Sequence, residues 1–265
     1  MRSPKEAGLG GESSSNVERA AQILLLLGPA GKEGMQLRDL TERTGENRSA
    51  VHRALVALAR SGFVEMPAQG RGYRLGSAIF ALAQHQRRLD TDLADIRAAA
   101  IEVASRSGQC TYLMARAGLD VVCIEMLAGS SPMQTVTGGA GGRLPLGVGS
   151  GSVSMLATLD ERTREAILDN NADRYALYSN WSREEIAASI ARTMTDGFSY
   201  EIGQMFPDIG GVAVAAPGRD GTAAYAVVIS AHKDMLTPPN LAAFAKIMRG
   251  AVERASSTAA ATAYR

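Results

Sequence analysis

The side chains best suited to catalysis or metal binding are scattered along this chain of 265 residues. The histidines are His52, His85 and His232, and the cysteines are Cys110 and Cys123. No H-x-x-x-H, C-x-x-C or H-x-E pattern occurs, although such spacings are what place metal ligands or a base on one side of an element. We therefore expect no catalytic residue, no metal site and no cofactor.

A glycine-rich segment, LPLGVGSGS at residues 144–152, is a better candidate for ligand binding. It contains neither G-x-S-x-G nor G-K-[ST], which argues against a hydrolase elbow and a P-loop. Its G-x-G-x-G spacing lacks the βαβ unit and the later acidic residue of a dinucleotide site. If the segment turns into a helix, its free amides and the hydroxyls of Ser150 and Ser152 would suit a small anion. A plain loop, in which the glycines only reverse the chain, is the alternative.

A helix with one basic face is predicted from residue 48 to residue 60. When Val51, Ala54, Leu55 and Leu58 form its buried side, small and basic groups fall on the opposite side. Such a helix, after another helix and a glycine turn, has the form of a DNA major-groove reader. Its expected DNA-facing residues are Arg48, Ser49, His52, Arg53, Val56 and Arg60.

The hairpin expected after this helix adds three more candidates for DNA contact. Arg71, Tyr73 and Arg74 would be placed to reach the neighbouring DNA backbone or minor groove. The alternative is a three-helix bundle whose arginines are only solvated.

The elements around the basic helix fit a small first domain at residues 15–76, after a flexible leader at 1–14. Its first helix begins with a capping box formed by Ser15 and Glu18. The segment LRDLTERT forms a second helix that ends at Gly45, and Asn47 caps the third. Two extended runs, FVEM and YRL, then form the hairpin.

The charge differs between the two parts of the chain. Residues 15–91 hold 11 Lys and Arg against 7 Asp and Glu, whereas residues 92–265 hold 15 against 18. The difference favours a polyanionic partner for the first part, and ordinary variation of surface charge is the alternative.

The longest aliphatic run, residues 23–27, is too short to span a bilayer, and the first residues lack a signal-peptide core. We expect a cytoplasmic protein with no membrane partner.

Residues 77–91 are predicted to connect the two parts, with one amphipathic helix at 77–89. Its apolar stripe is too broad for a solvent-exposed spacer, because burying each large apolar side chain is worth about 1.5–3 kcal/mol. We expect the stripe to contribute to dimerisation through Ile79, Phe80, Leu82 and Ala83.

The larger part, residues 92–256, mixes helices and strands in an α+β pattern. Because consecutive strands are joined by short turns as hairpins, the sheet is expected to be mainly antiparallel. A helix from residue 239 to about 255 and a flexible tail at 257–265 end the chain. The predicted strands are TYLMAR, VVCIEML, MQTVT, RLPL, FSYE, VAVAA and AAYAVVIS, and the helices between them are GSGSVSMLATL, ERTREAILDN and one from a capping box of Ser182 and Glu185 to Gly197.

These segments resemble the IclR family of bacterial transcription regulators. VERAAQILLLL, LRDLTERTGENRSAVHRALVALARSGFVE and GRGYRLG are similar to the family's winged helix-turn-helix domain. GLDVVCIEML, GGRLPLGVGSGS, DGFSYE and GGVAVAAPGRDG are similar to its effector-binding domain. Glu46 and Asn47 stand where family members often have an apolar residue and a proline, so Asn47 is expected to set the start of the reading helix.

The resemblance implies a ligand-responsive regulator with a winged helix-turn-helix, a connecting helix and a GAF/profilin-like effector domain. The implied partners are a double-stranded DNA operator, a small-molecule effector and further copies of the chain, as a homodimer or a dimer of dimers. Such a protein would be nucleoid-associated. The family's effector pocket lies between the glycine-rich segment and the sheet, so its expected lining is Leu113, Ile124, Met133, Val148, Gly149, Ser150, Gly151, Ser152, Met155, Tyr200 and Val214.

Free amides beside apolar strand residues favour a small organic acid as the effector. Its binding would shift the protein between dimer arrangements that hold the two reading helices at different separations. The alternative from another class is an enzyme that acts on a small carboxylate and carries an N-terminal interaction module. Turnover of a bound ligand would distinguish that enzyme from a regulator.

Overall fold

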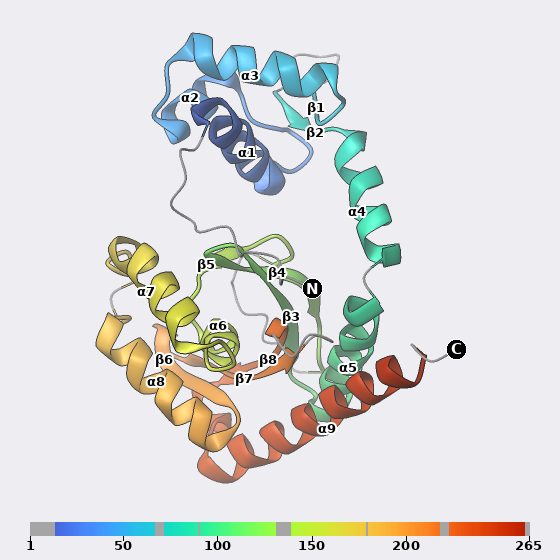
Figure 1. The fold of residues 1–265 in the computed structure, drawn as a ribbon, viewed down its shortest axis with the longest axis vertical. Helices are drawn as coiled ribbons and strands as arrows, with labels where there is room; N and C mark the ends of the chain where they lie inside the picture. Colours follow the sequence, from blue (N-terminus) through green and yellow to red (C-terminus); the bar gives the residue numbers. More distant parts are fainter. Residues whose placement is uncertain are drawn as a thin grey trace, which may run out of the picture. The chain divides into compact units, whose positions relative to one another are not determined.

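The computed structural model describes residues 14–66, 72–89, 91–130, 139–178, 180–217 and 223–262. The chain divides into two compact units, Met1–Leu89 and Asp90–Arg265 (Figure 1). Within the described ranges, no helix is both long enough and apolar enough to cross a membrane.

The first unit is helical and carries a small antiparallel hairpin. Its core side chains come from the first three helices and the first strand, and include Ile23, Leu40 and Leu55. The predicted order of three helices, a hairpin and a helix at 77–89 is confirmed. The elements are α1 (Ser15–Leu27), a 3-10 turn (Gly28–Ala30), α2 (Leu37–Thr44), α3 (Arg48–Arg60), β1 (Val64–Glu65), β2 (Arg74–Leu75) and α4 (Ser77–Leu89).

The predicted end of α2 and start of α3 are confirmed. Gly45 ends α2 in the left-handed conformation, with a φ of 67° that suits a residue without a side chain. The side chain of Asn47 accepts a hydrogen bond from the Ala50 amide at 2.8 Å. The capping box predicted at Ser15 and Glu18 is wrong, because Ser14 is the N-cap and its side chain makes no capping bond. With that start, Glu18 is the fourth helical residue, and the box requires the third.

The second unit is built on a six-stranded sheet with the order β5-β4-β3-β8-β7-β6. Every neighbouring pair is antiparallel, which confirms the expected α+β fold. The strands are β3 (Cys110–Ala117), β4 (Asp120–Leu127), β5 (Arg143–Pro145), β6 (Ser199–Phe206), β7 (Ile209–Pro217) and β8 (Ala223–His232). The helices are α5 (Thr91–Ser107), α6 (Ser150–Leu156), α7 (Glu161–Tyr175), α8 (Arg183–Asp196) and α9 (Pro238–Thr262).

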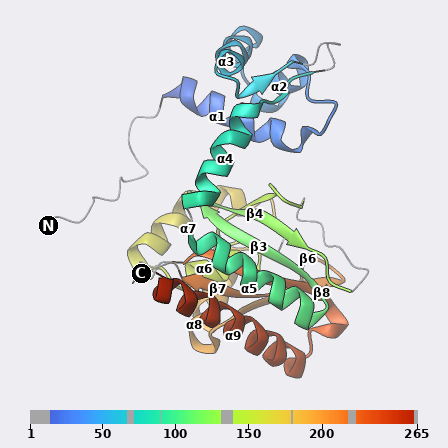
Figure 2. The same cartoon turned by 90° about the vertical axis from the view of Figure 1, so that its right-hand side faces the viewer.

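Helices cover both faces of this sheet (Figure 2). Helices α5 and α9 lie on one face, and α6, α7 and α8 lie on the other. Side chains alternate between the two layers along each strand. On β3, Tyr112 and Met114 join the core beside α6, whereas Leu113 joins the core beside α5 and α9.

Several elements of the second unit are longer than predicted, among them one strand and two helices. Strand β6 continues to Phe206, α7 to Tyr175 and α9 to Thr262. Helix α9 therefore includes much of the segment that the sequence predicts as a flexible tail, because a run rich in alanine favours continued helix. The predicted strand at 133–137 and leader residues 1–13 lie outside the described part of the chain.

Candidate functional site

Helix α3 presents a polar and basic face on the first unit. On its inner side Val51 and Leu55 are fully buried, and this packing fixes the rotation of the helix about its axis. The predicted division into an inner and an outer face is therefore confirmed. The predicted outward residues are all exposed: Arg48, Ser49, His52, Arg53, Val56 and Arg60.

An ion pair that the sequence analysis did not predict holds the turn before α3. Arg19 on α1 donates from Nη2 to Oε1 of Glu46 at 2.9 Å, and the Arg19 side chain is only 11% exposed. The next residue, Asn47, caps α3 and also accepts a hydrogen bond from the Ser49 hydroxyl at 2.8 Å. The start of α3 is thus tied to α1 by side chains. No pattern within one element could reveal this partner, which is distant in the sequence.

The predicted hairpin residues have local contacts in the first unit. Tyr73 packs partly buried against the core, and its backbone pairs with Met35. Arg74 lies across the hairpin from Glu65, with 3.3 Å between Nη2 and Oε1. Arg71 lies outside the described residues. DNA contacts by these hairpin residues stay a prediction.

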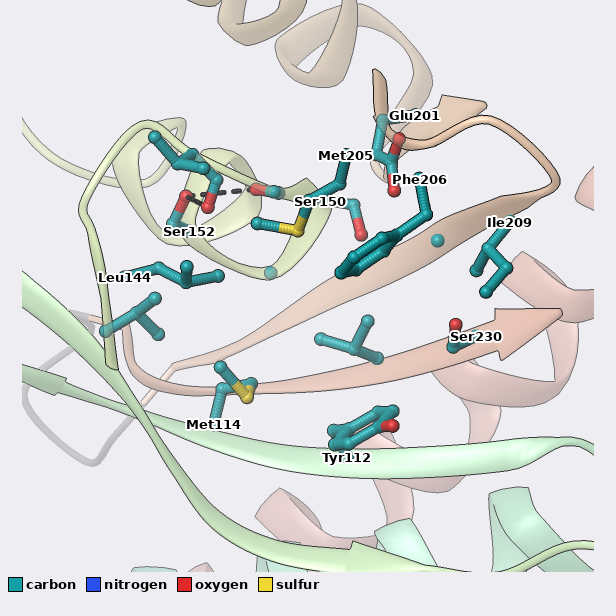
Figure 3. A pocket seen from close by; sticks show the side chains of 16 residues that line it. Tyr112, Met114, Leu144, Ser150, Ser152, Glu201, Met205, Phe206, Ile209 and Ser230 are labelled. Atoms are coloured by element: carbon teal, nitrogen blue, oxygen red, sulfur yellow. Dashed lines mark hydrogen bonds between the residues drawn. The ribbon is translucent and has the colours of Figure 1, made fainter. Parts of the chain in front are cut away.

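A cavity lies on the α6 side of the sheet in the second unit (Figure 3). It holds about 530 Å³ of unfilled space, part of which is open to solvent. The glycine-rich residues that were predicted to line a pocket do line this one: Val148, Gly149, Ser150, Gly151 and Ser152. The other lining residues are Tyr112, Met114, Val121, Leu144, Glu201, Met205, Phe206, Ile209, Gly211, Val228 and Ser230.

Five other residues predicted to line the pocket do not reach this cavity. Leu113, Tyr200 and Val214 pack on the opposite face of the sheet, against α5 and α9. Met155 is fully buried in the core, and Ile124 is 40% exposed on β4. For Leu113, Tyr200 and Val214 the cause is that residue type does not reveal which face a side chain joins in a sheet buried on both faces.

The sixth, Met133, lies outside the described residues.

The two hydroxyls of the glycine-rich segment have different roles. The Ser152 hydroxyl accepts from the Gly147 amide at 3.0 Å and donates to the Val148 carbonyl at 2.7 Å, so it stabilises the turn. The Ser150 hydroxyl has no hydrogen-bond partner among the described residues. Its own carbonyl accepts from the Ser199 hydroxyl of β6 at 2.6 Å, which anchors the start of α6 to the sheet. Of the two hydroxyls, that of Ser150 is therefore the one available to bond to a ligand.

Glu201 is a cavity residue that the sequence analysis missed. It is 8% exposed, and its carboxylate accepts a hydrogen bond from the Gln204 amide at 3.2 Å. Burial raises the pKa of this carboxyl to about 7, although the amides of Gln204 and Met205 act to lower it. Among the described lining residues there is no Lys, Arg or His to neutralise its charge.

The three histidines belong to three different elements. His52 lies on α3, His85 on α4 and His232 at the end of β8. Burial raises the pKa of the Cys123 thiol to about 11, so it is a poor nucleophile at neutral pH. In the part of the chain that the structure describes, no three His, Cys, Asp or Glu side chains are grouped to hold a metal ion.

Two protein-family models match the chain, and together they cover most of it. The model of the IclR helix-turn-helix domain matches residues 16–67. The model of the bacterial transcriptional regulator IclR C-terminal domain matches residues 90–257. The HTH-type transcriptional regulator XynR of Escherichia coli (strain K12) is 25% identical over 236 residues, which are 86% of this chain and 90% of that protein.

Solved structures share the fold. An IclR transcriptional regulator from Alicyclobacillus acidocaldarius is similar with a TM-score of 0.76 and 22% identity, covering 93% of this chain and 99% of that chain. An IclR homologue from Microbacterium hydrocarbonoxydans, complexed with 4-hydroxybenzoate, has a TM-score of 0.71 and 21% identity, covering 92% of this chain and 98% of its own.

Replacing Glu201 by Gln is expected to change how stability depends on pH. The ordinary pKa of this carboxyl is 4.5, and in the folded protein it is about 7. Between these values the folded state keeps a proton that the unfolded state releases. Raising the pH through this range therefore lowers the free energy of unfolding, by up to about 3 kcal/mol. In the Glu201→Gln variant this fall in the free energy of unfolding between pH 4.5 and pH 7 should be absent.

Urea denaturation at pH 5 and pH 8 measures the effect. Trp181, the single tryptophan, is buried in the second unit and reports on its unfolding by fluorescence. Glu184→Gln, an exposed change on α8, is the matched control and should keep the wild-type slope. If the free energy of unfolding of Glu201→Gln changed with pH as much as that of the wild type, proton retention by Glu201 would be contradicted.

Proposed function

Because the chain belongs to the IclR family of bacterial transcription regulators, we propose that it binds an operator through α3 and a small organic acid in the cavity of its second unit. The observation that carries the DNA proposal is the outward face of α3, where six predicted residues are exposed while Val51 and Leu55 anchor the helix. A helix held in this way can enter a major groove and present arginines to base edges.

The composition of the cavity supports an organic acid as the effector. Most of its wall is apolar, which suits the body of a small hydrophobic molecule. The Ser150 hydroxyl is in this wall, and residues 149–152, which also line it, add backbone amides; hydroxyls and amides of this kind are hydrogen-bond donors for a carboxylate. The Microbacterium hydrocarbonoxydans homologue was crystallised with an aromatic acid, 4-hydroxybenzoate.

Binding without turnover is the proposed role of this cavity. Neither a histidine nor a cysteine is among its described lining residues. Product formed from a bound acid would instead support the enzyme alternative.

Self-association through α4 is the third part of the proposal. Phe80 is 68% exposed and Leu82 is 55% exposed, and Ala83 is exposed beside them. Ile79, on the same helix, is partly buried. Large apolar side chains in water favour burial against a partner. A single helix-turn-helix makes few base contacts, so two copies that read two half-sites would gain specificity. We propose a homodimer, or a dimer of dimers, as the assembly.

Arg53→Ala is expected to weaken specific operator binding by about 1–3 kcal/mol if the guanidinium makes two hydrogen bonds to one base. Genome fragments retained by the protein supply the operator, and fluorescence anisotropy measures the affinity for it and for unrelated DNA. Arg162→Ala, an exposed arginine change on α7, is the control and should leave both affinities unchanged. Wild-type operator affinity in folded Arg53→Ala would remove the DNA surface from this part of α3.

Ser150→Ala is expected to weaken acid binding by about 0.5–1.5 kcal/mol, because it removes a hydroxyl with no partner in the described protein. Calorimetric titration with benzoate, 4-hydroxybenzoate and hexanoate, each beside its neutral amide, measures the affinity. The acids should bind more tightly than the amides. Ser152→Ala is the matched variant and should lower stability instead, since that hydroxyl bonds within the turn. Equal binding of acid and amide would refute the carboxylate site.

Phe80→Glu is expected to lower the dimer affinity while the subunit stays folded, because the side chain is already exposed in the single chain. Ala81→Glu places the same charge on the side of α4 opposite the apolar stripe, where the side chain is also exposed, and is the control. Analytical ultracentrifugation measures the change. Wild-type sedimentation of Phe80→Glu would show that this helix is not part of the dimer contact.

A further inference from the structure

Two buried polar groups point at the same space inside the cavity. A Cβ atom built on Gly211 would lie 2.6 Å from Oγ of Ser150 and 3.7 Å from Oε1 of Glu201. Ser150 is 4% exposed and Glu201 is 8% exposed, and Figure 3 shows both at the α6 side of the cavity. Ser150, Glu201 and Gly211 all line the cavity, and Gly211 adds no side chain beside either oxygen.

The charge of Glu201 is not balanced by a basic group in the cavity. The first cause of its raised pKa is burial, and no charged neighbour contributes to the shift. Besides Glu201, Tyr112 is the one titratable side chain among the described lining residues. The charged groups of the surrounding elements lie outside this lining: Arg116 of β3, Arg143 of β5 in a pair with Asp120 at 2.8 Å, Arg192 of α8 over the Tyr200 ring at 4.4 Å, Lys233 in a pair with Asp208 at 2.7 Å and His232 in a pair with Asp234 at 3.2 Å.

A carboxylate ligand beside Ser150 would therefore meet a second carboxyl at close range. Two carboxylates without a cation between them cannot both stay charged in a poorly hydrated site, and such pairs share one proton. A simple carboxylic acid in solution has a pKa of about 4–5. Burial holds the pKa of Glu201 at about 7, so near neutral pH the protein carboxyl is the group that keeps the proton.

We propose that the cavity binds one carboxylate together with one proton, which Glu201 carries while its hydroxyl donates a hydrogen bond to the ligand. The proton comes from solvent, and no covalent bond of the ligand changes. This inference rests on the proposed effector function and adds a dependence on pH to it. The site should also favour monocarboxylates, because a second negative charge would remain unbalanced.

Calorimetric titration of the full-length protein tests the inference with benzoate, 4-hydroxybenzoate and hexanoate as probes. For the wild type, the dissociation constant of a binding acid should be about tenfold larger at pH 8 than at pH 6, because Glu201 must be protonated before it binds. Titrations in two buffers with different ionisation heats should show uptake of about half a proton at pH 7 and nearly one at pH 8.

Glu201→Gln keeps the shape of the side chain and donates without titrating. In this variant the dissociation constant should change less than twofold between pH 6 and pH 8, and proton uptake should vanish. Glu184→Gln, exposed on α8, should behave as the wild type. The neutral amides should bind without dependence on pH, which controls for a general effect of pH on the protein.

Different failures identify different errors. Acid binding in the wild type without proton uptake, or with the same pH dependence in Glu201→Gln, would overturn this inference and leave the acid effector in place. Release of protons on binding would overturn it as well, because the ligand would then require an ionised Glu201. If none of the three acids binds at either pH, the proposed effector class is wrong and this inference fails with it.

Discussion

Burial of the sheet on both faces is the constraint on which the second unit depends. Every side chain of the central strands must fit one of two helical layers, so the helices approach the strands closely. Helix α6 comes so near that a Cβ on Gly151 would lie 2.7 Å from Cγ2 of Val228. On the strand side, a Cβ on Gly211 would lie 2.6 Å from the Ser150 hydroxyl. Glycine at these two positions lets the helix start sit directly on the sheet, and the cavity lies beside that contact.

The same constraint explains what the sequence could predict. Elements with local signals were found, because Gly45, Asn47 and the capping box at Ser182 act through neighbours in the chain. The position of the glycine-rich turn at the cavity was also found, since its composition is unusual. The face of the sheet to which a side chain points could not be read from strands that are apolar throughout. Leu113 and Val214 were therefore placed in the wrong layer, since nothing in an apolar run marks which layer a residue joins.

Glu201 escaped prediction for a related reason. A single acidic residue in a strand is usually taken for a solvated side chain, and only the fold shows that α6 and β7 bury it. Arg19 and Glu46 escaped because their ion pair joins α1 to the turn before α3. Together with the Asn47 cap, this ion pair fixes the first turn of the basic helix.

A proton that binds with the effector would make the regulator respond to two signals at once. By linkage, the proton raises the affinity for the acid by the same factor as the acid raises the affinity for the proton. The effect has a limit, because tenfold in affinity is about 1.4 kcal/mol, whereas reversing a two-state equilibrium from 1:99 to 99:1 needs about 5.5 kcal/mol. The proton can therefore tune the response, and the apolar wall around the ligand must supply most of the energy that distinguishes the two states.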